Sequence, residues 1–254
     1  MESAGDEKAA GVGVKKQLTA LVTRPREDSA ATAIELERRG IAVMVEPLLD
    51  IVPLDVAVDA SGVQGILATS ANGIRALARC LPERAIPVFA VGDASARVAR
   101  ELGYTSVDSA NGDVDSLAEL VAARTTPSAG ALLHAAGTAV AGDLAGLLAG
   151  FEIRRLVLYE ARTATELSPT LRQALASGEI DLALFFSPRT AATFATLVRA
   201  AGVAEALSRV AAYGLSANVA RQLEALPWRR LKTAAQPTQA ALLAALDDDL
   251  GFRA

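Results

Sequence analysis

Histidine and cysteine are nearly absent from this chain of 254 residues, which contains one of each, His134 and Cys80. One histidine and one cysteine cannot form a multi-histidine or His/Cys metal site, and a single cysteine cannot form an internal disulfide. The sequence therefore predicts chemistry without a metal. Cys80 falls on the apolar face of a helix predicted at 72–81, which indicates a buried structural thiol rather than a nucleophile.

Aromatic residues make up only 4% of the chain although hydrophobic residues make up 52%, so we expect cores of Ala, Leu and Val. Apolar runs stay well short of the roughly 18 to 20 residues that cross a membrane. The net charge of −4 argues against a nucleic-acid surface. Residues 1–17 mix charged and small residues without an apolar centre, which predicts a disordered tail, no secretory signal and a cytoplasmic location.

The chain contains an internal repeat. The segment SARVAREL at 95–102 returns as SANVARQL at 216–223, with six of eight positions identical. The segments upstream of each copy pair more faintly, as strand, turn and helix in the same order. Such self-similarity predicts two domains of like fold.

Strands alternate with helices along both halves, with helices predicted at 138–149 and 216–225 among them, a pattern typical of βαβ units. We therefore expect a flavodoxin-like α/β fold with two parallel-sheet domains. Domain A is predicted to be discontinuous, with residues 18–40 joined to 165–254, and domain B to span 55–150. The extended segments 41–54 and 151–164 are predicted to be interdomain connector strands that pair as an antiparallel ribbon, with a ligand cleft between the domains.

Small polar residues follow several predicted strands, where the next helix begins. The carboxyl ends of parallel strands share one edge of a sheet, and helix N-termini there offer unpaired N–H groups and a positive dipole end. With Arg24, Arg75 and Arg189 nearby, these junctions predict a receptor for a large polyanion. Gly92 and Gly214 are predicted to let a ligand approach the backbone. Taken singly, the same Ser, Thr, Asn and Asp residues are more typical of ordinary helix N-caps.

Nucleotide-binding motifs do not fit the chain. The segment GTAVAG at 137–142 lacks the Lys-Ser/Thr ending of a phosphate-binding loop, and no G-x-G-x-x-G follows a predicted strand. An unrelated nucleotide-dependent α/β protein is therefore disfavoured.

The junction segments read, in order, LVTRP, LATSANGIRAL, FAVGDASARVARELG, LVLYEAR, IDLALFFSPRTAATF and YGLSANVARQL followed by PTQAALLAAL. Together they resemble uroporphyrinogen-III synthase from about Leu18 to Leu246. The resemblance implies two α/β domains joined by a two-stranded connector. It also implies a cofactor-independent lyase that closes hydroxymethylbilane into uroporphyrinogen III, with inversion of ring D and loss of water. Hydroxymethylbilane is a linear tetrapyrrole that carries eight carboxylates.

The resemblance also implies roles for residues at matching positions. Tyr159, the tyrosine of LVLYEAR, is the candidate catalytic residue that assists departure of the substrate hydroxyl by hydrogen bonding. A tyrosine there is otherwise expected to bridge apolar and polar surroundings. The substrate-binding candidates are Thr23, Arg24, Thr69, Ser70, Asn72, Gly92, Asp93, Ala94, Ser187, Gly214, Leu215 and Ser216.

Residues 135–142 depart from the family because they contain no arginine where it often has several. His134 is a candidate substitute for such an anion contact, although an isolated histidine is more often structural. The missing arginines leave open a non-catalytic, synthase-like tetrapyrrole binder or sensor. The main prediction is an enzyme that acts as a monomer, without nucleic-acid or membrane partners, and makes at most transient contact with the upstream bilane-forming enzyme.

Overall fold

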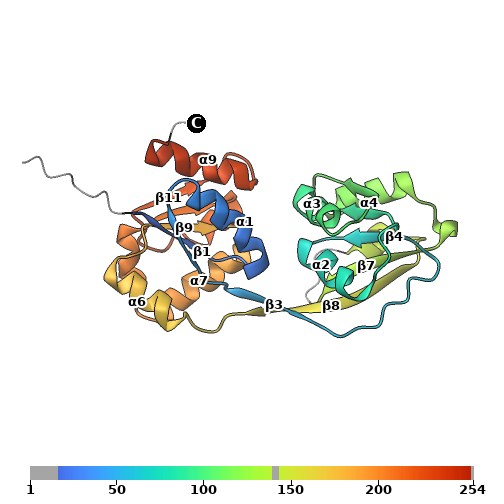
Figure 1. The fold of residues 1–254 in the computed structure, drawn as a ribbon, viewed down its shortest axis with the longest axis horizontal. Coiled ribbons are helices and arrows are strands. Elements are labelled where there is room, and N and C mark those ends of the chain that lie inside the picture. Colours follow the sequence, from blue (N-terminus) through green and yellow to red (C-terminus); the bar gives the residue numbers. More distant parts are fainter. Residues whose placement is uncertain (1–16, 139–142, 253–254) are drawn as a thin grey trace, which may run out of the picture. The chain divides into compact units, whose positions relative to one another are not determined.

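The computed structural model describes residues 17–138 and 143–252, and the chain divides into two compact units. Unit 1 contains the residues up to Leu48 and those from Ala164 onward, and unit 2 spans Leu49–Thr163. Figure 1 shows the blue N-terminal segment and the orange to red C-terminal segment together in unit 1. The predicted tail lies outside the described residues, apart from Gln17.

Unit 1 contains a five-stranded parallel sheet in the order β11-β10-β9-β1-β2. Its strands are β1 (Thr19–Val22), β2 (Ala42–Val45), β9 (Leu182–Phe185), β10 (Ala211–Gly214) and β11 (Arg230–Thr233). Its helices are α1 (Arg26–Glu37), α6 (Pro169–Ser177), α7 (Pro188–Ala200), the 3₁₀ helix η2 (Ala204–Arg209), α8 (Ala217–Arg221) and α9 (Gln239–Leu250). Successive strand residues face opposite sides, so Leu21 joins the core with α6 and α7, while Val22 joins the core with α1 and α9.

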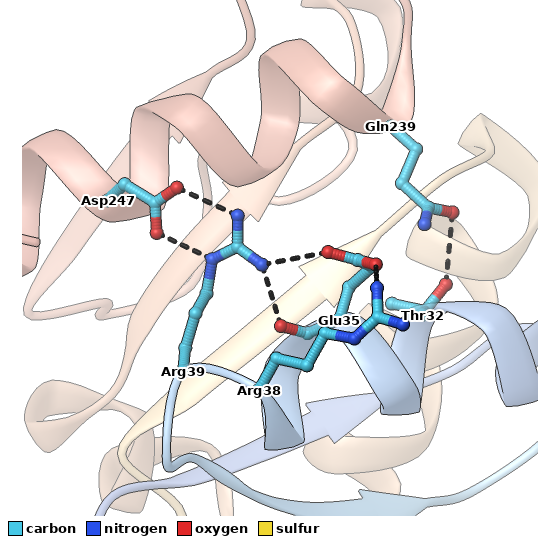
Figure 2. Close-up of polar contacts among 6 residues, drawn as sticks. All are labelled: Thr32, Glu35, Arg38, Arg39, Gln239 and Asp247. Atoms are coloured by element: carbon cyan, nitrogen blue, oxygen red, sulfur yellow. Dashed lines mark hydrogen bonds and ion pairs between the residues drawn. The ribbon is translucent and has the colours of Figure 1, made fainter. Parts of the chain in front are cut away.

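The helices α1 and α9 are also linked by polar contacts on their shared side of the sheet. Arg39 binds Asp247 through two nitrogens, with Nε to Oδ1 at 2.7 Å and Nη2 to Oδ2 at 2.9 Å (Figure 2). Nearer the helix starts, Thr32 donates to Gln239 Oε1 at 3.2 Å. Thr32 precedes Arg39 in the chain, and their partners Gln239 and Asp247 follow one another in the same order. The two helices therefore run parallel, as expected for helices that follow parallel strands.

Unit 2 contains a six-stranded sheet in the order β3-β8-β7-β4-β5-β6, parallel except for β3. Its strands are β3 (Leu49–Pro53), β4 (Val63–Ala68), β5 (Val88–Ala90), β6 (Val107–Ser109), β7 (Ala131–Gly137) and β8 (Ile153–Thr163). Its helices are α2 (Ala71–Cys80), α3 (Asp93–Glu101), α4 (Val114–Arg124), the 3₁₀ helix η1 (Pro127–Ala129) and α5 (Leu144–Leu147). One core packs α2 and α3 on the sheet, and a second packs α4 and α5 on the opposite side.

The predicted connector at 41–54 is divided between the two sheets. Its first part, β2, pairs in parallel with β1, so β1, α1 and β2 form a βαβ unit. Its second part, β3, pairs antiparallel with the end of β8, from Leu49 opposite Thr163 to Pro53 opposite Tyr159. The antiparallel pairing agrees with the prediction, and Pro53 lies on an edge strand, where a missing N–H is tolerated.

The prediction of two α/β parallel-sheet units is confirmed, with two helices shorter than expected. The helix predicted at 138–149 is described only as α5, and residues 139–142 lie outside the described residues. The helix predicted at 216–225 ends at Arg221, after which Leu226 N donates to Leu223 O at 3.0 Å in a tighter turn ahead of Pro227. Within 17–138 and 143–252, no helix combines the length and apolar character needed to cross a membrane.

Candidate functional site

Tyr159 and Ser70 are hydrogen-bonded to each other in unit 2. The hydroxyl oxygen of Tyr159, on β8, lies 3.1 Å from Ser70 Oγ. Ser70 is the N-cap of α2, and its Oγ accepts a hydrogen bond from Gly73 N at 3.1 Å. The structure therefore brings the catalytic candidate and one substrate-binding candidate together at the start of a helix.

A bulge and a glycine determine where the Tyr159 ring lies. The register of β7 and β8 shifts between Ala136 and Gly137, so that Gly137 stands opposite Tyr159. A Cβ built on Gly137 would lie 2.6 Å from Tyr159 Cζ, closer than a carbon contact allows. Two hydrogen bonds fix the same segment: Thr138 N donates to Tyr159 O at 3.0 Å, and the side-chain Nη2 of Arg155 donates to Gly137 O at 2.7 Å.

Thr69 lies beside His134, the only histidine of the sequence. Thr69 Oγ1 is 3.2 Å from His134 Nε2, and the His134 side chain on β7 is buried. Burial, with a smaller contribution from the Arg155 charge, lowers the pKa of His134 to about 4. His134 is therefore neutral near pH 7 and does not supply the positive charge that an arginine would bring to a carboxylate.

The other unit 2 candidates lie in the first turns of α2 and α3. Asn72 Oδ1 accepts from Arg75 Nη1 at 3.0 Å. Gly92 is the N-cap of α3, and a Cβ built there meets nothing within 4 Å, so the space before this helix is open. Asp93 and the exposed Ala94 follow it; with its amide nitrogen turned toward Asp93, Asn111 donates to Asp93 Oδ2 at 3.0 Å.

In unit 1, Thr23 and Arg24 follow β1 at the carboxyl edge of the sheet. Thr23 is fully buried, and its Oγ1 donates to Leu184 O at 3.4 Å. The Arg24 guanidinium lies 4.3 Å from the centre of the Phe186 ring, and its Nη1 donates to Gln239 Oε1 at 2.9 Å. Arg24 is therefore held by the segment after β9 and by the first residue of α9.

Ser187, Gly214, Leu215 and Ser216 complete the unit 1 candidates. Ser187 is the N-cap of α7 and accepts from Thr190 N at 3.1 Å. Leu215 N donates to Phe185 O of β9 at 2.9 Å, so this amide already has a hydrogen-bond partner within the protein. A Cβ on Gly214 would lie 3.3 Å from a backbone nitrogen of α8, so helix packing accounts for this glycine. Ser216 is the N-cap of α8 but makes no side-chain capping bond.

The two copies of the repeat do not place their serines at equivalent positions. Ser216 precedes α8 with φ −154° and ψ 167°, and the residue that precedes α3 in the same way is Gly92, with φ −161° and ψ 171°. Ser95 is instead buried in the first turn of α3. The residues that do match are the buried Val98 and Val219 with the alanine that follows each. The repeat therefore reflects how each helix packs on its sheet.

The sequence interpretation missed Gly137 and Gln239. Gly137 leaves room for the Tyr159 ring, and Gln239 accepts a hydrogen bond from Arg24. Gln239 stands in the PTQAALLAAL segment, whose position at a helix start was the available signal. In the described part of the chain, no group of three or more His, Cys, Asp or Glu residues is arranged to hold a metal ion.

The fold and these residues define a two-unit α/β protein in which polar helix N-termini collect at the carboxyl edge of each parallel sheet. The sequence model described as uroporphyrinogen-III synthase HemD matches residues 30–244. The chain therefore belongs to the uroporphyrinogen-III synthase family, which makes it an enzyme of haem biosynthesis and confirms the resemblance found in the sequence.

Solved structures share the fold. A mutant uroporphyrinogen III synthase from the extremely thermophilic bacterium Thermus thermophilus is 20% identical with a TM-score of 0.50, and the match covers 93% of this chain and 100% of that chain. The uroporphyrinogen-III synthetase from Helicobacter pylori is 16% identical with a TM-score of 0.58 over the same shares. At these identities the likeness establishes the fold alone. None of the curated proteins compared with the chain matches it.

Proposed function

We propose that the protein closes hydroxymethylbilane into uroporphyrinogen III, with inversion of ring D and loss of water, as a lyase that needs no cofactor. The family match over residues 30–244 carries this proposal. The contact between Tyr159 and Ser70 supports it, because it puts a weakly acidic hydroxyl at a helix N-terminus in a partly exposed position.

In the proposed reaction, Tyr159 donates its proton to the departing hydroxyl of the bilane. The carbon–oxygen bond breaks, water leaves, and an azafulvene cation remains. The substituted carbon of ring D attacks this cation, and a spiro-pyrrolenine intermediate rearranges to the closed macrocycle. Loss of a proton from the closing ring returns the phenol to its starting state, so the balance is one bilane to one macrocycle and one water.

The carboxylates of the substrate are proposed to bind at helix N-termini in each unit, where N–H groups and the helix dipole favour anions. The open space before Gly92 supports a role for α3. In unit 1 the support is the Arg24 guanidinium over the ring of Phe186, the residue that precedes the N-cap Ser187 of α7. The roles of Thr23, Gly214 and Leu215 are best read as structural, since burial, helix packing and a sheet hydrogen bond account for them.

We further propose that the protein is a cytoplasmic monomer that takes the bilane by transient contact with the enzyme that makes it. Within the described residues, four large hydrophobic side chains are exposed: Ile34, Leu54, Leu147 and Phe252. So small a number favours a monomer, because stable interfaces use contiguous apolar patches. Light scattering at assay concentration tests this directly.

The decisive experiment supplies freshly made hydroxymethylbilane to the purified protein and identifies the uroporphyrinogen isomer after oxidation and chromatography. Isomer III is expected, whereas spontaneous closure gives isomer I. Heat-denatured protein is the control, and dialysis against a chelator before the assay tests whether the reaction needs a metal ion. Formation of isomer I alone, at the rate of the denatured control, would reject the proposal.

A further inference from the structure

We infer that Ser70 is a positioning residue for the reaction: its hydroxyl donates to the oxygen of Tyr159 as negative charge develops there. This inference rests on the proposed role of Tyr159. It assigns Ser70 a task different from substrate binding, namely to connect the N-terminus of α2 to the phenol.

The hydrogen bonds of Ser70 lead to this assignment. A serine hydroxyl has one proton to donate and two lone pairs that accept. Gly73 N donates to one lone pair, and the other contact that the structure gives Ser70 Oγ is the Tyr159 hydroxyl, at 3.1 Å. When Tyr159 releases its own proton to the substrate, its oxygen becomes an acceptor, and the Ser70 proton is within hydrogen-bond distance to meet it.

The start of α2 strengthens this donor. The Gly73 N–H belongs to the positive end of a helix of ten residues, and a hydroxyl that accepts from such a group is polarised toward giving its own proton. Charge-assisted hydrogen bonds are roughly twice as strong as neutral ones. The bond between Ser70 and Tyr159 should therefore be stronger in the transition state than in the resting enzyme, which is the condition for acceleration.

Two glycines, Gly73 in α2 and Gly137 at the end of β7, fix this geometry. A Cβ on Gly73 would lie 2.2 Å from Ala135 O, so the first turn of α2 can sit against β7 only with glycine there. Gly137 lies two residues after Ala135 on the same strand, and its missing side chain leaves the space that the Tyr159 ring fills. Both partners of the bond are thus held by one strand, which leaves little freedom in the distance between their oxygens.

The test compares Ser70→Gly in the natural protein with Ser70→Gly in a Tyr159→Phe background. Glycine is a fair N-cap and costs only a few tenths of a kcal/mol, so the helix start is retained while the hydroxyl is lost. We expect Ser70→Gly to lower kcat about tenfold with little change in KM, and to have no further effect once Tyr159 is Phe. Ser70→Thr, which keeps the hydroxyl, should retain most of the turnover.

Asp113→Gly is the matched control, because it removes the N-cap side chain of α4, which packs on the opposite side of the sheet from α2. It should lower stability slightly and leave kcat unchanged. A second measurement uses tyrosine labelled with ¹³C at Cζ, whose chemical shift reports the hydrogen bond of each phenol. Of the three tyrosines in the sequence, only Tyr159 should shift in Ser70→Gly, with Tyr104 and Tyr213 as internal references.

Three results would overturn the inference. An equal fall in kcat with and without the Tyr159 hydroxyl would mean that Ser70 acts independently of the phenol, and an unmoved Tyr159 Cζ signal would mean that the bond is absent in solution. Full turnover by Tyr159→Phe would remove the role of both residues. Failure of the proposed function is distinct from all of these, since it appears as isomer I from the unaltered protein.

Discussion

The ring of Tyr159 occupies the space that a side chain on Gly137 would need, since a Cβ there would lie 2.6 Å from Cζ and 3.0 Å from the hydroxyl oxygen. Replacing Gly137 with alanine therefore forces the ring away from Ser70. We expect Gly137→Ala to lower kcat by about tenfold or more, since a displaced catalytic group loses transition-state contact. Steady-state kinetics on protein shown to be folded by circular dichroism gives the measurement.

A matched substitution separates this effect from simple overpacking. A Cβ on Gly65 would lie 2.7 Å from the ring of Phe89, in the second core of the same unit. Gly65→Ala should destabilise the protein by about 1 to 3 kcal/mol, as overpacked cores do, while leaving kcat of the folded enzyme intact. Equal losses of kcat in both variants would show that Gly137 has no particular link to the site.

Loss of the Tyr159 hydroxyl alone should reduce turnover far more than stability. We expect Tyr159→Phe to lower kcat about 100-fold, the usual order for removing a positioned acid, and the free energy of unfolding by about 1 kcal/mol. Tyr104→Phe is the control in the same unit, because the Tyr104 hydroxyl is buried without a hydrogen-bond partner in the described part of the chain. Turnover by Tyr159→Phe equal to that of the Tyr104 variant would exclude the proposed acid.

Local patterns were enough to predict most of the fold and part of the site. The alternation of strands and helices and the N-cap residues are encoded over short windows, so the two parallel sheets and Ser70 followed from the sequence. The contact between Ser70 and Tyr159 did not follow. Strict alternation along β8 puts Tyr159 on the face opposite the buried Leu158, and only the register shift at Gly137 turns it toward α2.

The division of the segment 41–54 between two sheets could not be predicted from the sequence for a similar reason. Its apolar, β-branched residues fit either sheet, and the choice depends on which distant strand each half meets, β1 for one and β8 for the other. Such pairing is tertiary information that a single sequence does not carry locally. The same applies to Gln239, whose contact with Arg24 joins residues from opposite ends of the chain.

His134 should make stability depend on pH in a defined range. Its folded-state pKa of about 4 lies below the ordinary value of 6.5, so the unfolded chain binds more protons in between, and stability falls as pH decreases. Between pH 6.5 and 5 the loss should be about 2 kcal/mol in urea titrations. His134→Gln, which keeps a polar group beside Thr69, should remove most of this dependence, because the sequence has no other histidine. An unchanged slope in that variant would contradict the assignment.

Gln239 should influence substrate affinity through Arg24. Its Oε1 accepts from Arg24 Nη1 at 2.9 Å, which helps to hold the guanidinium over Phe186. We expect Gln239→Leu to raise KM for hydroxymethylbilane about threefold to tenfold with kcat nearly unchanged, the pattern of lost uniform binding. In an Arg24→Met background the same change should have no added effect. Independent, additive increases in KM would show that Gln239 does not act through Arg24.

The ion pair between Arg39 and Asp247 should stabilise unit 1, whereas the neighbouring pair between Arg38 and Glu35 should contribute little (Figure 2). Arg39 meets Asp247 through two nitrogens and is about one-quarter exposed at 23%, whereas Arg38 contacts Glu35 with its side chain 70% exposed. Two-point geometry and partial burial reduce the loss to solvent screening and side-chain entropy. Arg39→Met should lower the free energy of unfolding by about 1 kcal/mol, and Arg38→Met by less than about 0.5 kcal/mol. A double-mutant cycle with Asp247→Asn isolates the pair, and a coupling energy near zero would mean that this ion pair does not stabilise the packing of α1 against α9.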